Sequence, residues 1–350
     1  MIMRLDKNAL LKGMVGSLVL VGLVLLGSRK LLYFDAALTP YLYATIFAVF
    51  GSIYRYSVWV SRPPTETLLK RSMQFVFSRH FFKYFFFVFK TFIDQIVLQK
   101  FIGRRSPYRW LMHFSLAWGC LIAFAVTFPL VFGWLHFENP AGHKDLYQLV
   151  VFGFPAQIFN PEGIIGFLFF NALNFCSVLL FIGTVMAFTR RFLNPGEMAI
   201  QTFAGDFLPL LILFSVAATG LFLTYSNHFL GGANYRVLTT IHCWTVVMLL
   251  VYLPFGKFFH IFQRAAQMGA ALYIKEREYG KQALCISCKQ PYTSEMQRED
   301  VKRILRDIGF QFQSNDNDVC MQDLCPLCRR KTLMVTQHKR LKGKFDIDHV

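Results

Sequence analysis

Six long apolar segments dominate this sequence and restrict it to a membrane-embedded helical fold. They occupy residues 9–27, 36–60, 110–134, 163–188, 207–225 and 241–262. A helix needs about 20 apolar residues to cross the hydrocarbon core of a bilayer. The composition agrees, because 55% of the residues are hydrophobic and the chain contains 40 Phe. The sequence therefore predicts an all-α, polytopic bundle of about six transmembrane helices.

The distribution of positive charge predicts the orientation of this bundle. The net charge of +17 is typical of proteins that bind nucleic acid. Nearly all the Lys and Arg, however, fall on one side of the predicted topology, and the other side holds only Arg29, Lys30, Lys144 and Arg236. Positively charged loops stay in the cytoplasm. We therefore expect a multi-pass membrane protein with both termini in the cytoplasm, with the lipid bilayer as a partner and no nucleic acid.

Residues 72–101 are rich in Phe but carry Lys83, Lys90 and Asp94. A span would bury these charges at a cost of a few kcal/mol each, whereas a helix in the interface lets the Lys side chains reach water. We expect one helix lying on the inner membrane surface, with His80 at the level of the headgroups.

The last apolar segment carries His242 and His260. In one continuous helix, 18 residues make five turns, so both rings would share a face about 27 Å apart. Neutral imidazole is a common haem ligand, and a histidine within a span needs a partner. The spacing is typical of a helix that ligates two stacked haems. The alternative is two interfacial histidines hydrogen-bonded to neighbouring helices.

His113 and His260 are expected at the same depth, because each lies within about one turn of the cytoplasmic end of its predicted span. Two histidines at one depth on different helices match axial ligation of one haem iron. His242 has no such partner, and His136, His143 and His228 are the candidates for a second haem. In the alternative interpretation, His242 hydrogen-bonds a quinone and does not ligate a second haem. Arg105, Arg109 and Lys257 are the expected partners of haem propionates.

The C-terminal tail carries Cys285-x-x-Cys288 and Cys325-x-x-Cys328 with 36 residues between them, plus Cys320. Two such knuckles present four thiolates and suit tetrahedral zinc. A rubredoxin-like iron site or an iron–sulfur cluster uses the same ligands, and unligated cysteines are the third possibility. The natural role of this tail is to dock a partner subunit.

Two segments resemble a known family. The sequence IHCWTVVMLLVYLPFGKFFHIFQ resembles the last span of the gamma subunit of respiratory nitrate reductase, and RRSPYRWLMHFSLAWG is similar to its earlier ligand helix. The membrane cytochromes of heterodisulfide reductase and of sulfite-reductase-linked complexes share this plan. The resemblance covers residues 36–263 and implies two b-type haems, with His113 and His260 on the inner haem and His242 on the outer one. Ala123 stands where the nitrate-reductase branch has a further His.

The resemblance implies a b-type cytochrome subunit of a respiratory oxidoreductase complex. Such a subunit passes electrons between the membrane quinone pool, menaquinone or ubiquinone, and a cytoplasmic iron–sulfur subunit through one or two haem b groups. The alternative is a haem-free transporter or membrane scaffold with a zinc-binding tail. The expected domains are an extra N-terminal span (1–35), the haem-binding bundle (36–263) and the cysteine-rich cytoplasmic tail (264–350).

Overall fold

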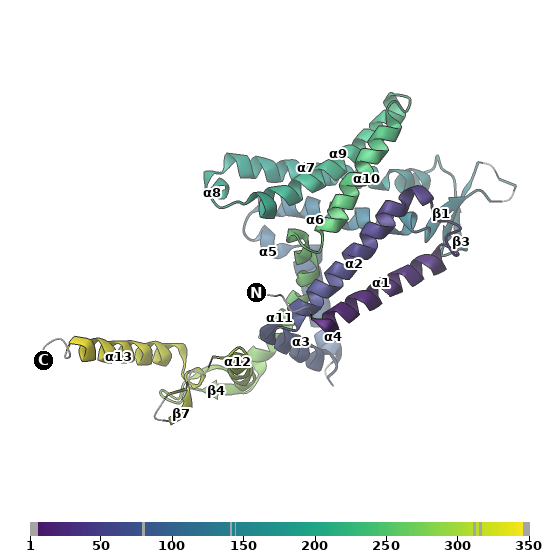
Figure 1. Cartoon of the computed structure of the whole chain (residues 1–350). Helices are drawn as coiled ribbons and strands as arrows, with labels where there is room; N and C mark the ends of the chain where they lie inside the picture. The colour runs from purple at the N-terminus through teal and green to yellow at the C-terminus, as the bar shows by residue number, and fades with distance from the viewer. Residues whose placement is uncertain are drawn as a thin grey trace. The chain divides into compact units, whose positions relative to one another are not determined.

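The computed structural model describes residues 6–78, 81–140, 142–143, 145–310, 313–314 and 317–345 (Figure 1). His80 and Lys144 lie outside the described residues. The chain divides into two compact units: Met1–Val58 with Ile93–Arg264, and Trp59–Phe92 with Ala265–Val350. The segment 59–92 therefore belongs with the tail and not, as expected, with the bundle.

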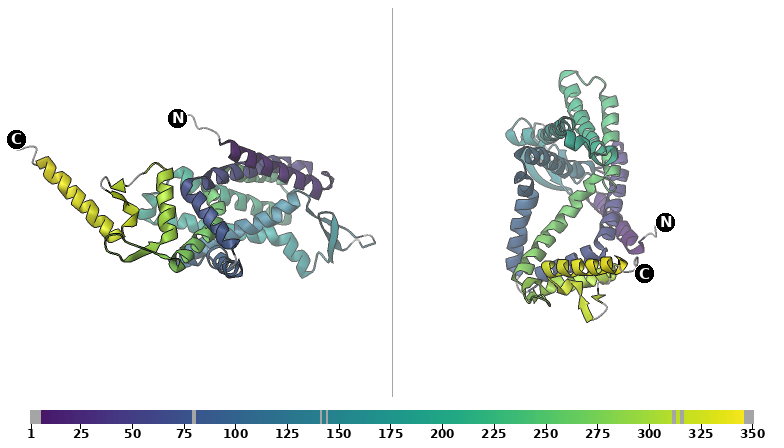
Figure 2. Two further views of the ribbon diagram at one scale, coloured as in Figure 1. Left: turned by 90° about the horizontal axis from the view of Figure 1, so that it is seen from below. Right: turned by 90° about the vertical axis from the view of Figure 1, so that its left-hand side faces the viewer.

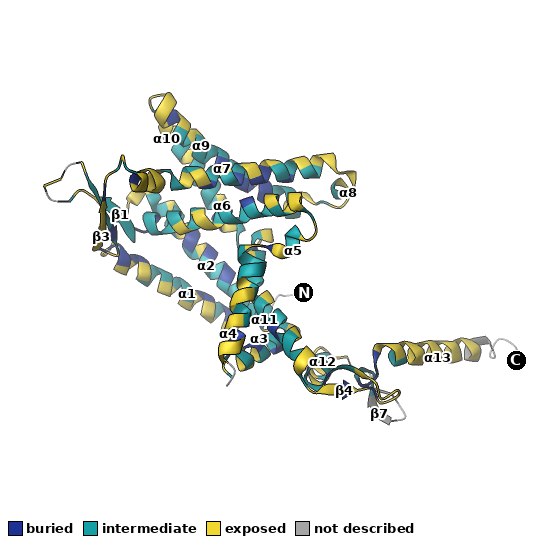
Figure 3. Ribbon diagram, turned by 180° about the vertical axis from the view of Figure 1, so that it is seen from behind, coloured by how far each residue is buried: buried dark blue, intermediate teal, exposed yellow. Residues whose placement is uncertain are grey.

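The first unit contains helices long and apolar enough to cross a membrane. Among the described residues, six segments qualify as candidate spans. They are Lys7–Gly27 (α1), Ala36–Val60 (a 3-10 turn and α2, Thr39–Val60), Pro107–Val131 (α6), Ile164–Leu193 (α7), Phe203–Phe229 (a π turn and α9, Leu208–Phe229) and Tyr235–Tyr252 (α10). Many side chains on the outer sides of these helices are apolar and exposed (Figure 3), as expected for lipid-facing surfaces. The structure confirms the predicted all-α, polytopic membrane bundle.

Glycines allow the central helices of the bundle to approach closely. A Cβ on Gly119 of α6 would lie 2.8 Å from Cγ of Leu180, and one on Gly183 of α7 would lie 2.9 Å from Cγ of Leu116. Small residues at such crossings are usual in membrane bundles. The core beside this crossing joins α7, α9 and α10 and consists of Leu180, Ile212, Leu213, Ala217 and Leu249.

The predicted single helix over residues 241–262 is wrong, because the chain breaks between α10 and α11 (His260–Tyr279). A 3-10 turn, Lys257–Phe259, precedes α11. Pro254 has no N–H for a helical hydrogen bond and disfavours helix at the residue before it. Arg55 of α2 donates to the carbonyl of Pro254 at 2.6 Å and stacks over the ring of Phe259 at 4.2 Å. His242 and His260 therefore lie on different helices.

The segment between α6 and α7 forms a small antiparallel sheet. Its strands are β1 (Leu135–Glu138), β2 (Tyr147–Val151) and β3 (Phe154–Phe159), paired in the order β1-β2-β3. Phe152 and Gly153 both have positive φ and make the two-residue turn between β2 and β3. This is the turn geometry that two-residue hairpins favour.

The Phe-rich segment is not the one interfacial helix expected over residues 72–101. It comprises the end of α3 (Pro63–Val76), α4 (Phe81–Phe92), a π turn (η2, Ile93–Val97) and α5 (Lys100–Gly103). Within the second unit, Tyr84 of α4 hydrogen-bonds Glu276, and Lys275 of α11 lies 4.0 Å from the ring centre of Phe87. The opposite face of α4 exposes Phe82, Phe86 and Phe89.

The rest of the second unit is built from α11, two hairpins and two further helices. These elements are β4 (Gln282–Leu284), β5 (Pro291–Ser294), α12 (Glu295–Asp307), β6 (Gln313–Ser314), β7 (Asn317–Cys320), a 3-10 turn (η5, Met321–Asp323) and α13 (Pro326–Phe345). Figure 2 shows α13 extending away from α12 and the hairpins. Asp300 of α12 joins α3 and α11, because it accepts hydrogen bonds from Arg71 and Tyr273.

Candidate functional site

His113 of α6 and His260, the first residue of α11, lie against each other in the first unit. Their ring centres are 6.4 Å apart and their planes are inclined at 66°. The break at residues 253–256 separates His260 from α10 and begins a new helix at this histidine. The structure thus brings together the two histidines that the sequence predicted as a pair.

Each of the two rings is held through its Nδ1 atom. Nδ1 of His260 lies 2.6 Å from the backbone carbonyl of Lys257, and Nδ1 of His113 lies 2.8 Å from Oε1 of Gln99. A carbonyl oxygen only accepts hydrogen bonds, so each Nδ1 carries the proton and each Nε2 keeps its lone pair. Ligating histidines usually show this arrangement, with the second nitrogen donating to a carbonyl or carboxylate.

The site favours neutral imidazole. Burial lowers the pKa of His260, and the charges of Arg264 and Lys257 lower it further, although the hydrogen bond to the Lys257 carbonyl acts in the opposite direction. Arg264 lies one turn after His260 on α11 and stacks over Phe101 at 4.4 Å. A neutral ring is the form that binds a metal.

The spacing of the two rings suits one metal ion between them. A metal–nitrogen bond is about 2 Å, and the ring centre lies roughly 1.2 Å behind Nε2, so two axial imidazoles place their centres about 6.3 Å apart. The observed separation is 6.4 Å. This separation is compatible with one metal ion, such as a haem iron, between the two Nε2 atoms, and it is also within the range of an ordinary contact between two rings.

Two cations expected at haem propionates are paired with acids instead. Arg109 lies 3.5 Å from Glu197, and Lys257 lies 2.7 Å from Asp206. Sequence reasoning overlooked Arg264 as a cation beside the histidines. Its signal was the four-residue step from His260, which places both residues on one face of a helix.

His242 has a different environment. Its Nδ1 lies 2.8 Å from Oγ1 of Thr219, and the Thr219 hydroxyl donates to the carbonyl of Ser215 at 2.7 Å. The hydroxyl oxygen therefore accepts from His242, which again leaves Nε2 with its lone pair. A Cβ on Gly220 would lie 3.5 Å from Cε1 of the ring, so α9 approaches it closely.

His136, the candidate second ligand of an outer haem, contacts other groups. Its ring stacks on Tyr33 with centres 4.0 Å apart, and its Nε2 lies 3.0 Å from Glu138. Neither interaction involves His242. Among the described residues, the structure therefore joins one pair of histidines, His113 with His260.

The second unit gathers four of the tail cysteines. The sulfurs of Cys285, Cys288, Cys325 and Cys328 all lie within 4.8 Å of one another, close enough to hold a metal ion. The sulfurs of Cys288 and Cys325 are 3.8 Å apart. Four thiolates at about 2.3 Å from one tetrahedral ion are about 3.8 Å apart, so the cluster matches a mononuclear site.

Backbone N–H groups donate hydrogen bonds to the sulfurs of the cluster. The N–H of Cys325 points at Sγ of Cys285 at 3.3 Å, and that of Cys328 points at Sγ of Cys325 at 3.4 Å. Burial alone would raise the pKa of Cys285, but hydrogen bonds from the backbone of Cys288, Cys325 and Ser287 lower this pKa to about 6. Cys320 lies outside the cluster, since its side chain caps η5.

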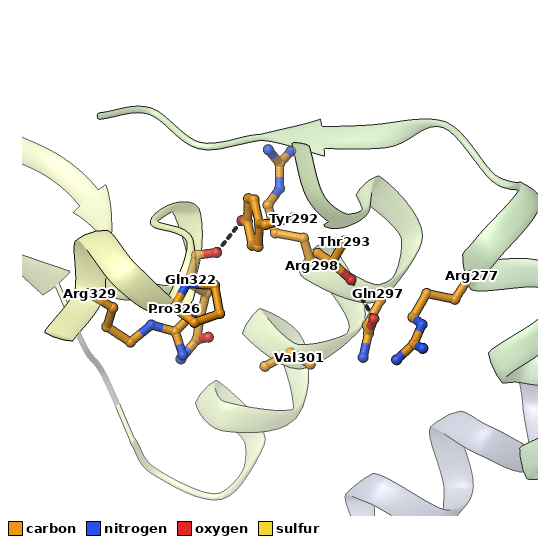
Figure 4. A pocket seen from close by; sticks show the side chains of 9 residues that line it. All are labelled: Arg277, Tyr292, Thr293, Gln297, Arg298, Val301, Gln322, Pro326 and Arg329. Atoms are coloured by element: carbon orange, nitrogen blue, oxygen red, sulfur yellow. Dashed lines mark hydrogen bonds between the residues drawn. The ribbon is translucent and has the colours of Figure 1, made fainter. Parts of the chain in front are cut away.

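A pocket of about 250 Å³ adjoins the cysteine cluster (Figure 4). Its nine lining residues are Arg277, Tyr292, Thr293, Gln297, Arg298, Val301, Gln322, Pro326 and Arg329. Tyr292 donates to the carbonyl of Gln322 at 2.5 Å and so joins β5 to η5 across one side of the pocket. The lining contains three arginines, and one of them, Arg298, is paired with Glu299 at 3.0 Å and with Asp323 at 3.7 Å.

Comparison with known proteins gave no match: no family model, no curated protein and no solved structure is similar to this chain at a significant level. Fold and sites therefore define the class. The chain is a multi-pass membrane protein with a helical bundle and a four-cysteine cluster able to hold a metal ion.

Proposed function

We propose that the chain is the b-type cytochrome subunit of a respiratory oxidoreductase complex. The observation that carries this proposal is the pair His113 and His260, with ring centres 6.4 Å apart and both Nδ1 atoms bound to carbonyl oxygens. Buried histidines in a membrane bundle mark functional sites by default. The similarity of the two histidine segments to the nitrate reductase gamma subunit points in the same direction.

The residues of this site have distinct roles. His113 and His260 would hold one haem b, which supplies one-electron chemistry when bound. Gln99 and the carbonyl of Lys257 orient the two rings, and the charge of Arg264 acts on both of them. The two Nδ1 hydrogen bonds leave the Nε2 lone pair of each ring free, and these are the atoms that would bind the iron.

We assign His242 to a quinone site rather than to a second haem. Its ring is fixed through Thr219 and its Nε2 faces no second histidine among the described contacts. A neutral imidazole in this position suits hydrogen bonding to a menaquinone or ubiquinone carbonyl. Electrons would then pass between the quinone pool and one haem, in either direction.

In the tail, we propose one structural zinc ion held by the four cysteines. Iron–sulfur clusters divide four thiolates between at least two iron atoms, which spreads the set further apart than the edge of one tetrahedron. A single iron ion remains the alternative, because it takes the same ligands. The tail would dock a cytoplasmic iron–sulfur subunit, and Arg277 and Arg329 of the pocket are the cations that acidic side chains of this partner would meet. Both termini would then lie in the cytoplasm, with the bundle in a bacterial or archaeal cytoplasmic (inner) membrane.

The haem proposal is tested by substituting the two histidines one at a time. His113→Ala and His260→Ala should each abolish the reduced-minus-oxidised haem spectrum of the purified chain while it still inserts into the membrane. His143→Ala, outside the bundle, is the matched control and should keep the spectrum. A haem-free scaffold or transporter predicts no spectrum in any of the four proteins.

The metal proposal is tested by elemental analysis of the purified chain. We expect one zinc per chain, lost in Cys285→Ser and Cys325→Ser. Cys320→Ser should keep the metal, since this sulfur caps η5 and lies outside the cluster. Iron in place of zinc would overturn the choice of metal, and metal retention in Cys285→Ser would overturn the site.

A further inference from the structure

We infer that Gln99 is a positioning residue that fixes the tautomer of His113 and sets how strongly this imidazole donates electrons to iron. This inference rests on the proposed haem at His113 and His260. It concerns a partly buried hydrogen bond, from Nδ1 of His113 to Oε1 of Gln99 at 2.8 Å.

The backbone at Gln99 has an unusual conformation. Its φ is 51° and its ψ 38°, in the left-handed region that residues other than glycine rarely adopt. The residue is only 5% exposed. The carbonyl of Gln99 accepts from the N–H of Ile102 at 2.9 Å and so begins α5. A strained, buried, polar residue of this kind is a reason to expect function.

Three side chains of α6 hold three consecutive residues of this segment. Nε1 of Trp118 donates to the carbonyl of Val97 at 3.1 Å, and Nε1 of Trp110 donates to the carbonyl of Leu98 at 2.8 Å. His113 donates to the next residue, Gln99. The two indoles thus fix the backbone that follows the π turn. The left-handed backbone of Gln99 then directs its side-chain amide to the ring of His113.

The hydrogen bond has a defined chemical effect. An acceptor at Nδ1–H increases the negative charge on the ring and strengthens its donation through Nε2. Stronger donation stabilises ferric relative to ferrous iron and lowers the reduction potential. At His260 the acceptor is a backbone carbonyl, which side-chain substitution cannot remove. Gln99 is therefore the side chain through which the sequence can adjust this iron.

The experiment compares the full-length wild-type protein with Gln99→Glu and Gln99→Leu by redox titration of the haem band. A carboxylate strengthens the hydrogen bond and a Leu side chain removes it. The potential should therefore be lowest in Gln99→Glu, intermediate in the wild type and highest in Gln99→Leu. The ferric electron paramagnetic resonance spectrum should shift in the same order. If Gln99→Leu does not retain haem, the test is whether the potential of Gln99→Glu is lower than that of the wild type.

Gln95→Leu is the matched control. It makes the same amide-to-leucine change within the preceding π turn (Ile93–Val97) and leaves the acceptor of the His113 hydrogen bond in place, so its potential should equal that of the wild type. Equal potentials in the Gln99 variants, or an equal shift in Gln95→Leu, would overturn the inference. Absence of haem from the wild type would instead overturn the proposed function and this inference with it.

Discussion

Asp300 shows how single residues hold the second unit together. The residue is 1% exposed, and its carboxylate accepts two hydrogen bonds from Arg71, at 2.9 Å each, with one from Tyr273 at 3.1 Å and one from Arg303 at 2.8 Å. These donors come from α3, α11 and α12 itself. A buried carboxylate is tolerated only when its charge and lone pairs are matched in this way.

Asp300→Asn should therefore destabilise the second unit by about 3–5 kcal/mol, because it leaves Arg71 without its buried counter-charge. Hydrogen exchange of the α3, α11 and α12 amides measures this loss. Asp307→Asn makes the same change on an exposed part of α12 and should leave exchange unaltered. Equal protection in both variants would contradict the role assigned to Asp300.

The environment of Tyr273 determines how the stability of the second unit should change at alkaline pH. Burial, followed by the charge of Asp300 and the hydrogen bond to it, raises the pKa of Tyr273. A raised folded-state pKa means that this stability is fully present below the unfolded pKa of about 10 and is lost as pH rises toward the folded value. Tyr273→Phe should flatten the fall in stability of the second unit above about pH 10. An unchanged slope would exclude Tyr273 as its source.

At the scale of elements, the break between α10 and α11 decides where His260 lies. The lengths and hydropathy of the spans were predictable from sequence, because both are local properties. Pro254 was a local signal for the break, but proline is tolerated within membrane helices, and the Arg55 donor for the Pro254 carbonyl is distant in sequence. The β1–β3 sheet also escaped prediction, because its pairing lies in a short segment dominated by loop signals.

The same distinction applies to the site. His113, His260 and the four clustered cysteines were recognisable by residue type and spacing. Gln99 was not recognisable from the sequence, because its role requires a left-handed backbone after a π turn and contacts from α6. Arg264 was recognisable from its four-residue step after His260, but the predicted span ended at residue 262, so this cation was assigned to the tail and not to the site.

Arg55→Met tests whether this break positions the histidine. The substitution leaves the buried carbonyl of Pro254 without its donor, at a cost of about 1–3 kcal/mol. We expect haem occupancy and the thermal stability of the haem spectrum to fall. Arg62→Met, at an exposed position just before α3, is the matched control and should behave as the wild type. Equal loss in both variants would indicate a general charge effect.

At the scale of the whole molecule, the chain consists of two units with different sources of stability. The first unit depends on helix packing in a bilayer, whereas the hairpins and η5 of the second are short elements gathered around the cysteine cluster. Small modules of this kind usually need their metal to fold.

Removing the metal with a strong chelator should therefore unfold the hairpins of the second unit and leave the bundle intact. Protease cleavage between β4 and α13 should increase, while the haem spectrum of the membrane unit persists. Loss of the spectrum together with the tail would contradict the independence of the two units. Resistance of the tail to cleavage would contradict a structural metal.

The most direct test of the central claim is the number of haem groups per chain. The full-length protein, purified after expression with ample haem, is measured by its dithionite-reduced-minus-oxidised spectrum and by the pyridine haemochrome. The paired histidines predict one b-type haem per chain. A protein without haem under these conditions would contradict the cytochrome proposal, and two haems per chain would contradict the assignment of His242 to a quinone site.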